Sequence, residues 1–257
     1  ALAVQGPTSG RLLKSLAEDA NIENLKYFRV TKATIAKVPV EISRTGYTGD
    51  LGYEVWVEAN QALRVWDALI EAGRIFDIKP AGMLALDVAR IEAGLLLIDV
   101  DFTSSKKALV TAQRYSPFEL GLGRLVHLDK NRFIGQQALL AENKRGPARM
   151  IAGLEIDWTE VERYYEAVGL PPAVSPIASR VAVPVYQNGS QVGKATSTTW
   201  SPVLKKMIAL ATLKSELTRP GTRVEIEITV EAVRHRVAAT VVKTPFYNPK
   251  QKTATPV

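Results

Sequence analysis

The chain has 257 residues, of which 46% are hydrophobic and 23% are charged, and its formal net charge is +7. These proportions are typical of a globular protein of one or two domains, and every apolar run is too short for a membrane-spanning helix, which needs roughly 20 residues. The absence of cysteine excludes disulfides, thiolate metal sites and cysteine nucleophiles, and it fits a cytoplasmic location.

The N-terminal region predicts strands interrupted by a helix. Apolar and alternating residues favour strands at residues 2–5, 27–35, 38–44 and 52–58. After the first of these, residues 9–17 favour a helix, because Leu12, Leu13 and Leu16 recur at helical spacing. In the last strand, Tyr53 alternates with Glu54, so the two side chains are expected on opposite faces of a sheet.

A glycine-rich turn, with the sequence SRTGYTGDLGYEV at residues 43–55, leads into that last strand. Its three glycines permit backbone angles and close approaches that side chains would block, so the loop can lie against a flat ligand with Glu54 behind it. A carboxylate can accept two parallel N–H donors from the edge of such a ligand. The alternative is an ordinary hairpin turn with Glu54 as a solvent-facing strand residue.

Two helices are expected next. The first covers residues 60–72, with Asn60 as N-cap, Gly73 as the stop, and a buried stripe. That stripe consists of Leu63, Trp66, Leu69 and Ile70. The second helix runs from Pro80 to a stop at Gly94, and its evenly apolar composition predicts burial. Its polar residues Arg90 and Glu92 then need partners, and a structural ion pair is favoured over a ligand contact.

The second half of the chain predicts a small barrel built from short strands. These strands are expected at residues 150–156, 181–186, 191–197, 208–213, 224–230 and 236–243. Asn188-Gly189 and Pro220-Gly221 are the expected turns between them. Residues 157–179 are expected to form a surface loop. The boundary between the two predicted domains is placed so that they cover residues 1–145 and 146–257.

The basic charge of the chain favours anionic ligands, but the basic residues are scattered and match no nucleic-acid-binding module. We therefore expect neither nucleic acid nor a membrane as a partner. The two histidines, His127 and His235, have no partner at metal-ligand spacing, so structural or surface roles are expected and no metal site is predicted.

Several segments occur in an order that resembles the glycine cleavage T-protein (aminomethyltransferase) family. They are LAVQGP at 2–7, the turn at 46–54, AGMLALDVARIEAG at 81–94, SPFELGLG at 116–123, FIG at 133–135, residues 193–206, RPGT at 219–222 and TPFY at 244–247. The resemblance implies an α+β fold, with a folate-binding α/β region followed by a C-terminal antiparallel β-barrel domain. It also implies tetrahydrofolate as cofactor.

The family resemblance also implies site residues. A glutamate at the position of Glu54 contacts the pterin ring in the family, and Tyr47 and Tyr53 flank it closely enough to stack on or edge that ring. Tyr47 is the stronger candidate for this contact, because the alternation of the strand places Tyr53 on the face opposite Glu54. Arg124 lies at a position near the family's ligand pocket, and Tyr247 is a weaker candidate for the pocket rim.

The chain departs from the family pattern at two of these positions. Leu86 stands where the T-proteins carry a folate-site arginine, and Arg124 stands where they commonly carry tryptophan. Leucine cannot make the contact of an arginine. These two differences leave the identity of the substrate undetermined, whereas the glutamate of the family pattern is present as Glu54.

The first residue is Ala1 rather than methionine, and the family's catalytic aspartate lies upstream of the segment that matches residues 2–7. The chain is therefore expected to be the later part of a longer protein. Asp50, Asp87 and Asp99 lie in plausible motifs but none matches that position, so the catalytic residue stays unknown and structural roles are expected for all three.

The leading hypothesis is a tetrahydrofolate-dependent one-carbon transferase, which moves a one-carbon unit from an amine- or methyl-bearing donor to reduced folate. Its partners would be folate, a small donor and a lipoyl carrier protein. One alternative is a folate-dependent demethylase of a small N-, S- or O-methyl compound. The other is a non-catalytic folate-binding accessory protein.

Overall fold

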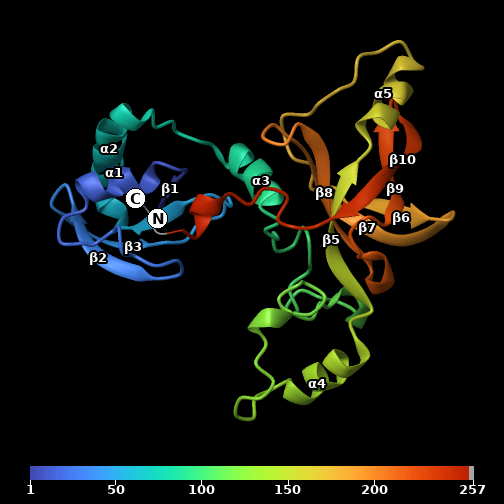
Figure 1. Ribbon diagram of the computed structural model, residues 1–257, viewed down its shortest axis with the longest axis horizontal. Coiled ribbons are helices and arrows are strands. Elements are labelled where there is room, and N and C mark those ends of the chain that lie inside the picture. Colours follow the sequence, from blue (N-terminus) through green and yellow to red (C-terminus); the bar gives the residue numbers. More distant parts are fainter. Residues whose placement is uncertain (255–257) are drawn as a thin grey trace. The chain divides into compact units, whose positions relative to one another are not determined.

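The computed structural model describes residues 1–254 and divides the chain into two compact units (Figure 1). The first unit contains Ala1–Ala93 and the chain from Tyr247 onward, and the second contains Gly94–Phe246. The chain therefore leaves the first unit, forms the second, and returns. No helix within the described residues is long and apolar enough to cross a membrane.

The first unit is built on an antiparallel sheet with strand order β1-β4-β3-β2. The strands are β1 (Leu2–Gln5), β2 (Val30–Ile35), β3 (Val38–Ser43) and β4 (Gly52–Trp56). All four predicted strands are confirmed. β2 begins three residues later than expected, because Phe28 has a left-handed backbone with φ of 58° that a strand cannot accommodate.

Two helices, α1 (Ser9–Leu16) and α2 (Ala62–Gly73), cover one face of this sheet (Figure 1). The core between them contains Leu13, Ile42, Val55, Val65 and Leu69, each at most 3% exposed. The predicted stripe of α2 is wrong at Leu63 and Trp66, which are exposed. The buried stripe passes instead through Val65 and Leu69, because α2 has apolar residues on two faces and only one can meet the sheet.

The predicted start of α2 is also wrong, whereas its predicted end at Gly73 is confirmed. Asn60 lies inside a 3-10 turn, Ala59–Gln61, and Gln61 occupies the N-cap position. Gly73 is the last residue of the helix but does not reverse the chain, which continues through a second 3-10 turn, Arg74–Phe76. The reversal comes at Asp77, whose φ is 55°. A short carboxylate side chain tolerates this left-handed conformation.

The helix α3 (Met83–Glu92) begins with Gly82 as N-cap rather than at Pro80, and Gly94, with φ of 66°, follows its end as predicted. The prediction that its apolar residues are buried is wrong for the first turn, where Met83 is 72% exposed. The buried residues are Asp87, Arg90, Ile91 and Glu92. Arg90 Nε donates to Asp87 Oδ1 at 2.8 Å, with both side chains at most 3% exposed, which confirms a structural ion pair for Arg90.

The second unit contains a closed antiparallel barrel with strand order β10-β5-β8-β7-β6-β9. Its strands are β5 (Arg149–Ile156), β6 (Val183–Gln187), β7 (Ser190–Ser201), β8 (Lys206–Lys214), β9 (Arg223–Val230) and β10 (Val233–Val242). The predicted barrel is therefore confirmed. The turn between β6 and β7 has positive φ at both Asn188 and Gly189, as a tight hairpin requires.

Two helices accompany the barrel, α4 (Gln136–Arg145) and α5 (Trp158–Glu166). The expectation of a plain loop at residues 157–179 is wrong for its first part, which forms α5. The carboxylate of Asp157 caps this helix by accepting hydrogen bonds from the backbone N–H groups of Thr159 and Glu160. Trp158 packs edge-to-face on Trp200. Further 3-10 turns are Thr111–Gln113, Gly123–Leu125, Ser215–Leu217 and Lys250–Lys252.

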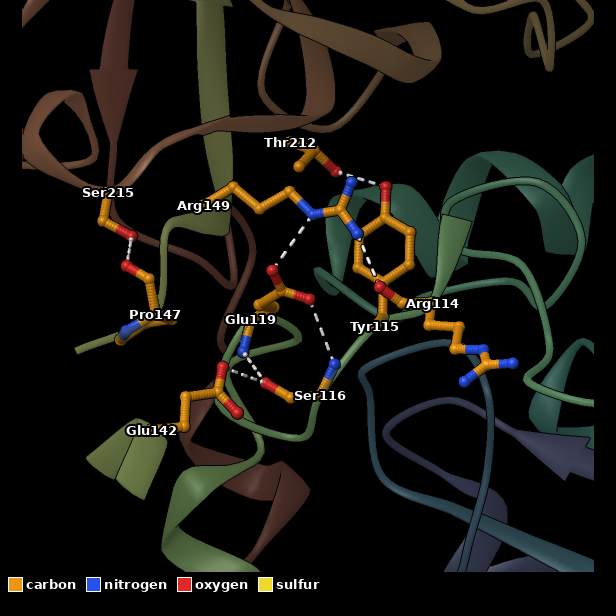
Figure 2. Close-up of polar contacts among 9 residues, drawn as sticks. All are labelled: Arg114, Tyr115, Ser116, Glu119, Glu142, Pro147, Arg149, Thr212 and Ser215. Atoms are coloured by element: carbon orange, nitrogen blue, oxygen red, sulfur yellow. Dashed lines mark hydrogen bonds and ion pairs between the residues drawn. The ribbon is translucent and has the colours of Figure 1, made fainter. Parts of the chain in front are cut away.

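A network around Arg149 fixes the segment before α4 to the start of β5 (Figure 2). The Arg149 guanidinium lies 4.0 Å from the centre of the Tyr115 ring and donates to Glu119 Oε1 at 3.1 Å. The other oxygen of Glu119 accepts the backbone N–H of Ser116 at 3.1 Å, and the hydroxyl of Ser116 donates to Glu142 at 2.7 Å. These charged groups therefore satisfy one another within the second unit.

Candidate functional site

The strand β4 presents Glu54 on the face of the sheet that α1 and α2 do not cover. Tyr53 and Val55, its neighbours in sequence, are fully buried in the core, whereas Glu54 is half-buried and Trp56 is 52% exposed. This alternation follows from the two-residue period of a strand. Glu54 and Trp56 therefore share one open face, and Glu54 pairs with Ser43 on β3.

Hydrogen bonds from two hydroxyl groups hold the Glu54 carboxylate in place. Its Oε2 accepts a hydrogen bond from the hydroxyl of Thr45 at 2.6 Å, and the hydroxyl of Ser43 lies 3.4 Å from the same oxygen. The two hydroxyls are 2.8 Å apart. Within the described residues both donors meet Oε2, so Oε1 keeps its accepting capacity. A fixed carboxylate with one available oxygen edge is a site for N–H donors of a ligand.

The glycines of the turn have a different role from the one expected. A Cβ at Gly46 would lie 2.1 Å from Gln5 Oε1, and one at Gly52 would lie 1.8 Å from the same atom. The Gln5 amide occupies this space and donates to the carbonyl of Tyr53 at 2.9 Å, and it accepts from Thr48 at 3.0 Å. These two glycines therefore make room for a side chain of the same unit, so the ligand argument rests on the face that bears Glu54.

The two tyrosines near Glu54 differ in their placement. Tyr53 has 0% exposure and belongs to the core, and its hydroxyl has no hydrogen-bond partner within residues 1–254. Burial, opposed by the positive charge of Arg44, raises the pKa of the Tyr53 phenol. Tyr47 is half-buried in the turn itself. Tyr53 thus packs in the core on the side of β4 opposite Glu54, and Tyr47 stays the stronger candidate for ligand contact.

Tyr247 joins the first unit from the C-terminal segment of the chain. Its backbone N–H donates to the carbonyl of Glu92 at 2.8 Å. Partial burial, followed by the negative charges of Asp50 and Glu92, raises the pKa of the Tyr247 phenol. Asp50 also accepts a hydrogen bond from Gln251 at 3.2 Å. Tyr247 is therefore held among acidic groups of the first unit.

Arg124 belongs to the second unit, unlike the other four predicted site residues. It lies in the 3-10 turn Gly123–Leu125, is exposed, and its guanidinium lies 3.4 Å from the carbonyl of Gly121. The structure brings Glu54, Tyr47, Tyr53 and Tyr247 into one unit. The role of Arg124 in ligand binding stays a prediction.

The three aspartates considered for catalysis all have structural partners. Asp87 pairs with Arg90, and Asp50 accepts the backbone N–H of Leu51 at 2.6 Å. Asp99 lies 2.5 Å from the ammonium of Lys107, and this hydrogen bond lowers the pKa of its carboxyl. Sequence patterns did not single out Asp101, which is 1% exposed and accepts hydrogen bonds from the hydroxyls of Thr196 and Ser197.

The histidines show no catalytic arrangement in the described part of the chain. His235 stacks on Tyr164 with 4.1 Å between the ring centres, and His127 is exposed. Across residues 1–254, no three histidine or acidic side chains converge as a metal site would require. A stacked ring and a surface ring are consistent with structural and surface roles.

Comparisons with known proteins support the family resemblance. The GCVT N-terminal domain model matches residues 1–130, and the model of the glycine cleavage T-protein C-terminal barrel domain matches residues 166–248. The predicted boundary at residue 145 lies between these two matches. A crystal structure of glycine cleavage system aminomethyltransferase T from Bartonella henselae shares the fold, with a TM-score of 0.73 at 23% identity, covering 96% of this chain and 59% of that one.

Among curated relatives, an aminomethyltransferase of Bacillus subtilis is 37% identical over 248 residues, which are 96% of this chain and 60% of the relative. One from Halothermothrix orenii is 35% identical, covering 95% of this chain and 60% of that relative. A trimethylamine-oxide aldolase of Ruegeria pomeroyi is 38% identical, covering 97% of this chain and 29% of that protein. The chain spans about 60% of the length of these aminomethyltransferases. With more than half of its length matched by the N-terminal domain model, the chain belongs to the glycine cleavage T-protein family.

Proposed function

We propose that this protein is a tetrahydrofolate-dependent one-carbon transferase of the aminomethyltransferase type. It would move a one-carbon unit from an amine- or methyl-bearing donor to a nitrogen of reduced folate. Two observations support this function: the family to which the chain belongs, and the fixed carboxylate of Glu54 on an open sheet face. The second is the observation that carries the folate assignment.

The residues around Glu54 fit a pterin. The edge of the pterin carries adjacent N–H donors, and an ionised carboxylate accepts such donors and offers none. Thr45 holds Oε2 of Glu54, which orients the carboxylate before a ligand arrives. Glu54 would hold the pterin edge, and Tyr47 would contact its ring.

When bound, reduced folate supplies the nucleophilic nitrogen that takes up the one-carbon unit. The residues of this chain bind and orient the pterin, which lowers the barrier by fixing the reacting groups. We assign proton handling to none of the described residues, because Asp50, Asp87 and Asp99 all have structural partners.

A folate-dependent demethylase is the second candidate, and two observations favour it. Leu86 and Arg124 replace an arginine and a tryptophan of the T-protein pattern, and a trimethylamine-oxide aldolase is among the similar proteins. The two candidates differ in the donor. Single-turnover formation of methylene-tetrahydrofolate from an aminomethyl-lipoyl carrier protein, with release of ammonia, would support the first. Formation of methyl-tetrahydrofolate from a methylated small amine, with release of the demethylated amine, would support the second. Folate binding without turnover from either donor would favour an accessory protein.

We further propose a lipoyl carrier protein as partner for the first candidate, on the strength of the family alone. A cytoplasmic location is also proposed, because a chain without cysteine suits a reducing compartment.

The folate site can be tested by calorimetric titration of tetrahydrofolate into the longest natural form of the protein. Glu54→Gln keeps the shape of the side chain and removes its charge, so we expect binding to weaken by about 1.5 to 3 kcal/mol, or roughly 10- to 150-fold. Glu71→Gln is the control, because this substitution removes the same charge from the same unit. The Glu71 side chain is 68% exposed on α2. Unchanged affinity for tetrahydrofolate in a folded Glu54→Gln variant would contradict the assignment of Glu54 to the folate site. Absence of saturable tetrahydrofolate binding by the wild-type protein would contradict the proposed transferase function.

A further inference from the structure

An indole ring lies beside Glu54 on the open face of the first-unit sheet. Trp56 follows Glu54 by two residues on β4, so both side chains project from the same face. The indole is 52% exposed, in contrast to Tyr53 and Val55 on the opposite face, which are fully buried. A large flat apolar surface thus stays accessible next to a fixed carboxylate.

A hydrogen bond turns this ring toward the carboxylate. Trp56 pairs with Glu41 across the sheet, yet its Nε1 donates to the hydroxyl of Ser43 at 3.3 Å. Ser43 is the cross-strand partner of Glu54, so the indole reaches diagonally back along the sheet. Such diagonal neighbours lie within reach of aromatic side chains.

The bond belongs to a series that ends on Glu54. Trp56 donates to Ser43, the hydroxyls of Ser43 and Thr45 are 2.8 Å apart, and Thr45 donates to Glu54 Oε2 at 2.6 Å. The indole N–H is only a donor and the ionised carboxylate only an acceptor, so these bonds can all point from the ring to the carboxylate. One set of four side chains therefore orients both the ring and the carboxylate.

We propose that Trp56 is a ligand-contacting residue whose indole packs against the face of the planar ring system that Glu54 binds by its edge. This inference rests on the proposed folate-binding function and names a contact that sequence patterns did not. Edge recognition by a carboxylate leaves the two faces of a planar ligand to be covered, and an indole provides a large rigid surface for one of them. The series through Ser43 and Thr45 fixes the ring before binding, which reduces the entropy lost on contact.

The experiment compares three variants of the longest natural form of the protein by calorimetric titration with tetrahydrofolate. Trp56→Ala removes the ring, and we expect roughly five- to 150-fold weaker binding, the range found when an aromatic platform under a heterocyclic base is removed. Trp56→Phe keeps a ring but loses the donor to Ser43, and an intermediate loss is expected. Trp66→Ala is the control, because this tryptophan is 39% exposed on α2 of the same unit, and it should bind as the wild type does.

Tryptophan fluorescence provides a second measurement, and a change in protein stability alone would not alter its response to the ligand. Binding should quench part of the tryptophan emission of the wild type and of Trp66→Ala, and this part should be absent in Trp56→Phe. Wild-type affinity in Trp56→Ala, with Glu54→Gln still weakened, would overturn the role of Trp56 and leave the folate site standing. Absence of binding by the wild type would overturn both.

Discussion

Single carboxylates in the first unit have opposite roles according to their surroundings. Glu54 is half-buried, with one oxygen held by Thr45 and the other left to accept, whereas Asp87 is 4% exposed and paired with Arg90. A buried charge requires a partner of opposite charge, while an exposed one stays available to a ligand. The position of each residue relative to the core therefore separates the proposed site residue from the structural one.

The ion pair of α3 leads to a stability prediction. Asp87→Ala would remove the carboxylate that lies 2.8 Å from Nε of Arg90, whose guanidinium is 1% exposed. We expect the free energy of unfolding to fall by about 3 to 5 kcal/mol, measured by urea denaturation. Asp67→Ala, which removes an exposed aspartate of α2, should change it by less than about 0.5 kcal/mol. A loss at Asp87 no larger than this control would contradict the structural pairing.

Residue patterns predicted Glu54 but not its companion Trp56. The alternation of β4 places both residues on one face, and which face the helices cover depends on the packing of the whole unit. The glycines of the turn show the same limit. Gly46 and Gly52 accommodate the Gln5 amide from β1, a contact across more than 40 residues that no local pattern contains.

Among the elements, strands were predicted more reliably than helices. All ten strands within residues 1–254 occupy predicted segments, because alternation and turn residues are local signals. The helix α2 was predicted in the right place, but the wrong face of it was expected to be buried. Apolar residues lie on two of its faces, and only one of them packs against the sheet. The helix α5 was missed because Asp157, its N-cap, stands in a segment rich in charged and aromatic residues rather than in an apolar stripe.

Close packing of β7 on β8 makes Gly193 sensitive to substitution. A Cβ at this position would lie 2.1 Å from the backbone oxygen of Thr212 and 3.0 Å from the Cα of Leu213. Backbone atoms cannot move aside as a side chain can, so Gly193→Ala should destabilise the barrel by about 1 to 3 kcal/mol in thermal or urea unfolding. Lys194→Ala is the matched control, because this side chain is exposed at the next position of the same strand and should change stability by less than about 0.5 kcal/mol. Equal stability of the two variants would show that the strands adapt more freely than the packing indicates.

At the scale of the whole molecule, the C-terminal segment is part of the first unit. Arg44 is 2% exposed and donates to the carbonyl of Leu25 at 3.0 Å and also to the carbonyls of Lys252 and Ala254. A charged group buried in the N-terminal half of the chain thus depends on acceptors more than 200 residues later. Sequence patterns give no indication of these hydrogen bonds, because no local pattern links Arg44, at the end of an alternating strand, to the polar residues near the C-terminus.

Removal of residues 250–257 tests this dependence. The buried Arg44 would lose its acceptors on the C-terminal segment, and we expect the first unit to lose about 1 to 3 kcal/mol of stability. Hydrogen exchange followed by mass spectrometry should then show faster exchange in β3 and α1, with β8 of the barrel unchanged. The same acceleration in both units, or in neither, would contradict a local role of this segment.

The hydrogen bond between the Glu92 carbonyl and the Tyr247 amide closes the point at which the chain leaves the first unit and returns to it. Within the second unit, Gly94 likewise lies against Thr244 and Pro245, so its two ends are also adjacent. The second unit as a whole is therefore an insert with neighbouring ends, the arrangement in which a domain insertion is tolerated without stretching its host. A short linker would therefore be enough to join residue 93 to residue 247 if the second unit were removed.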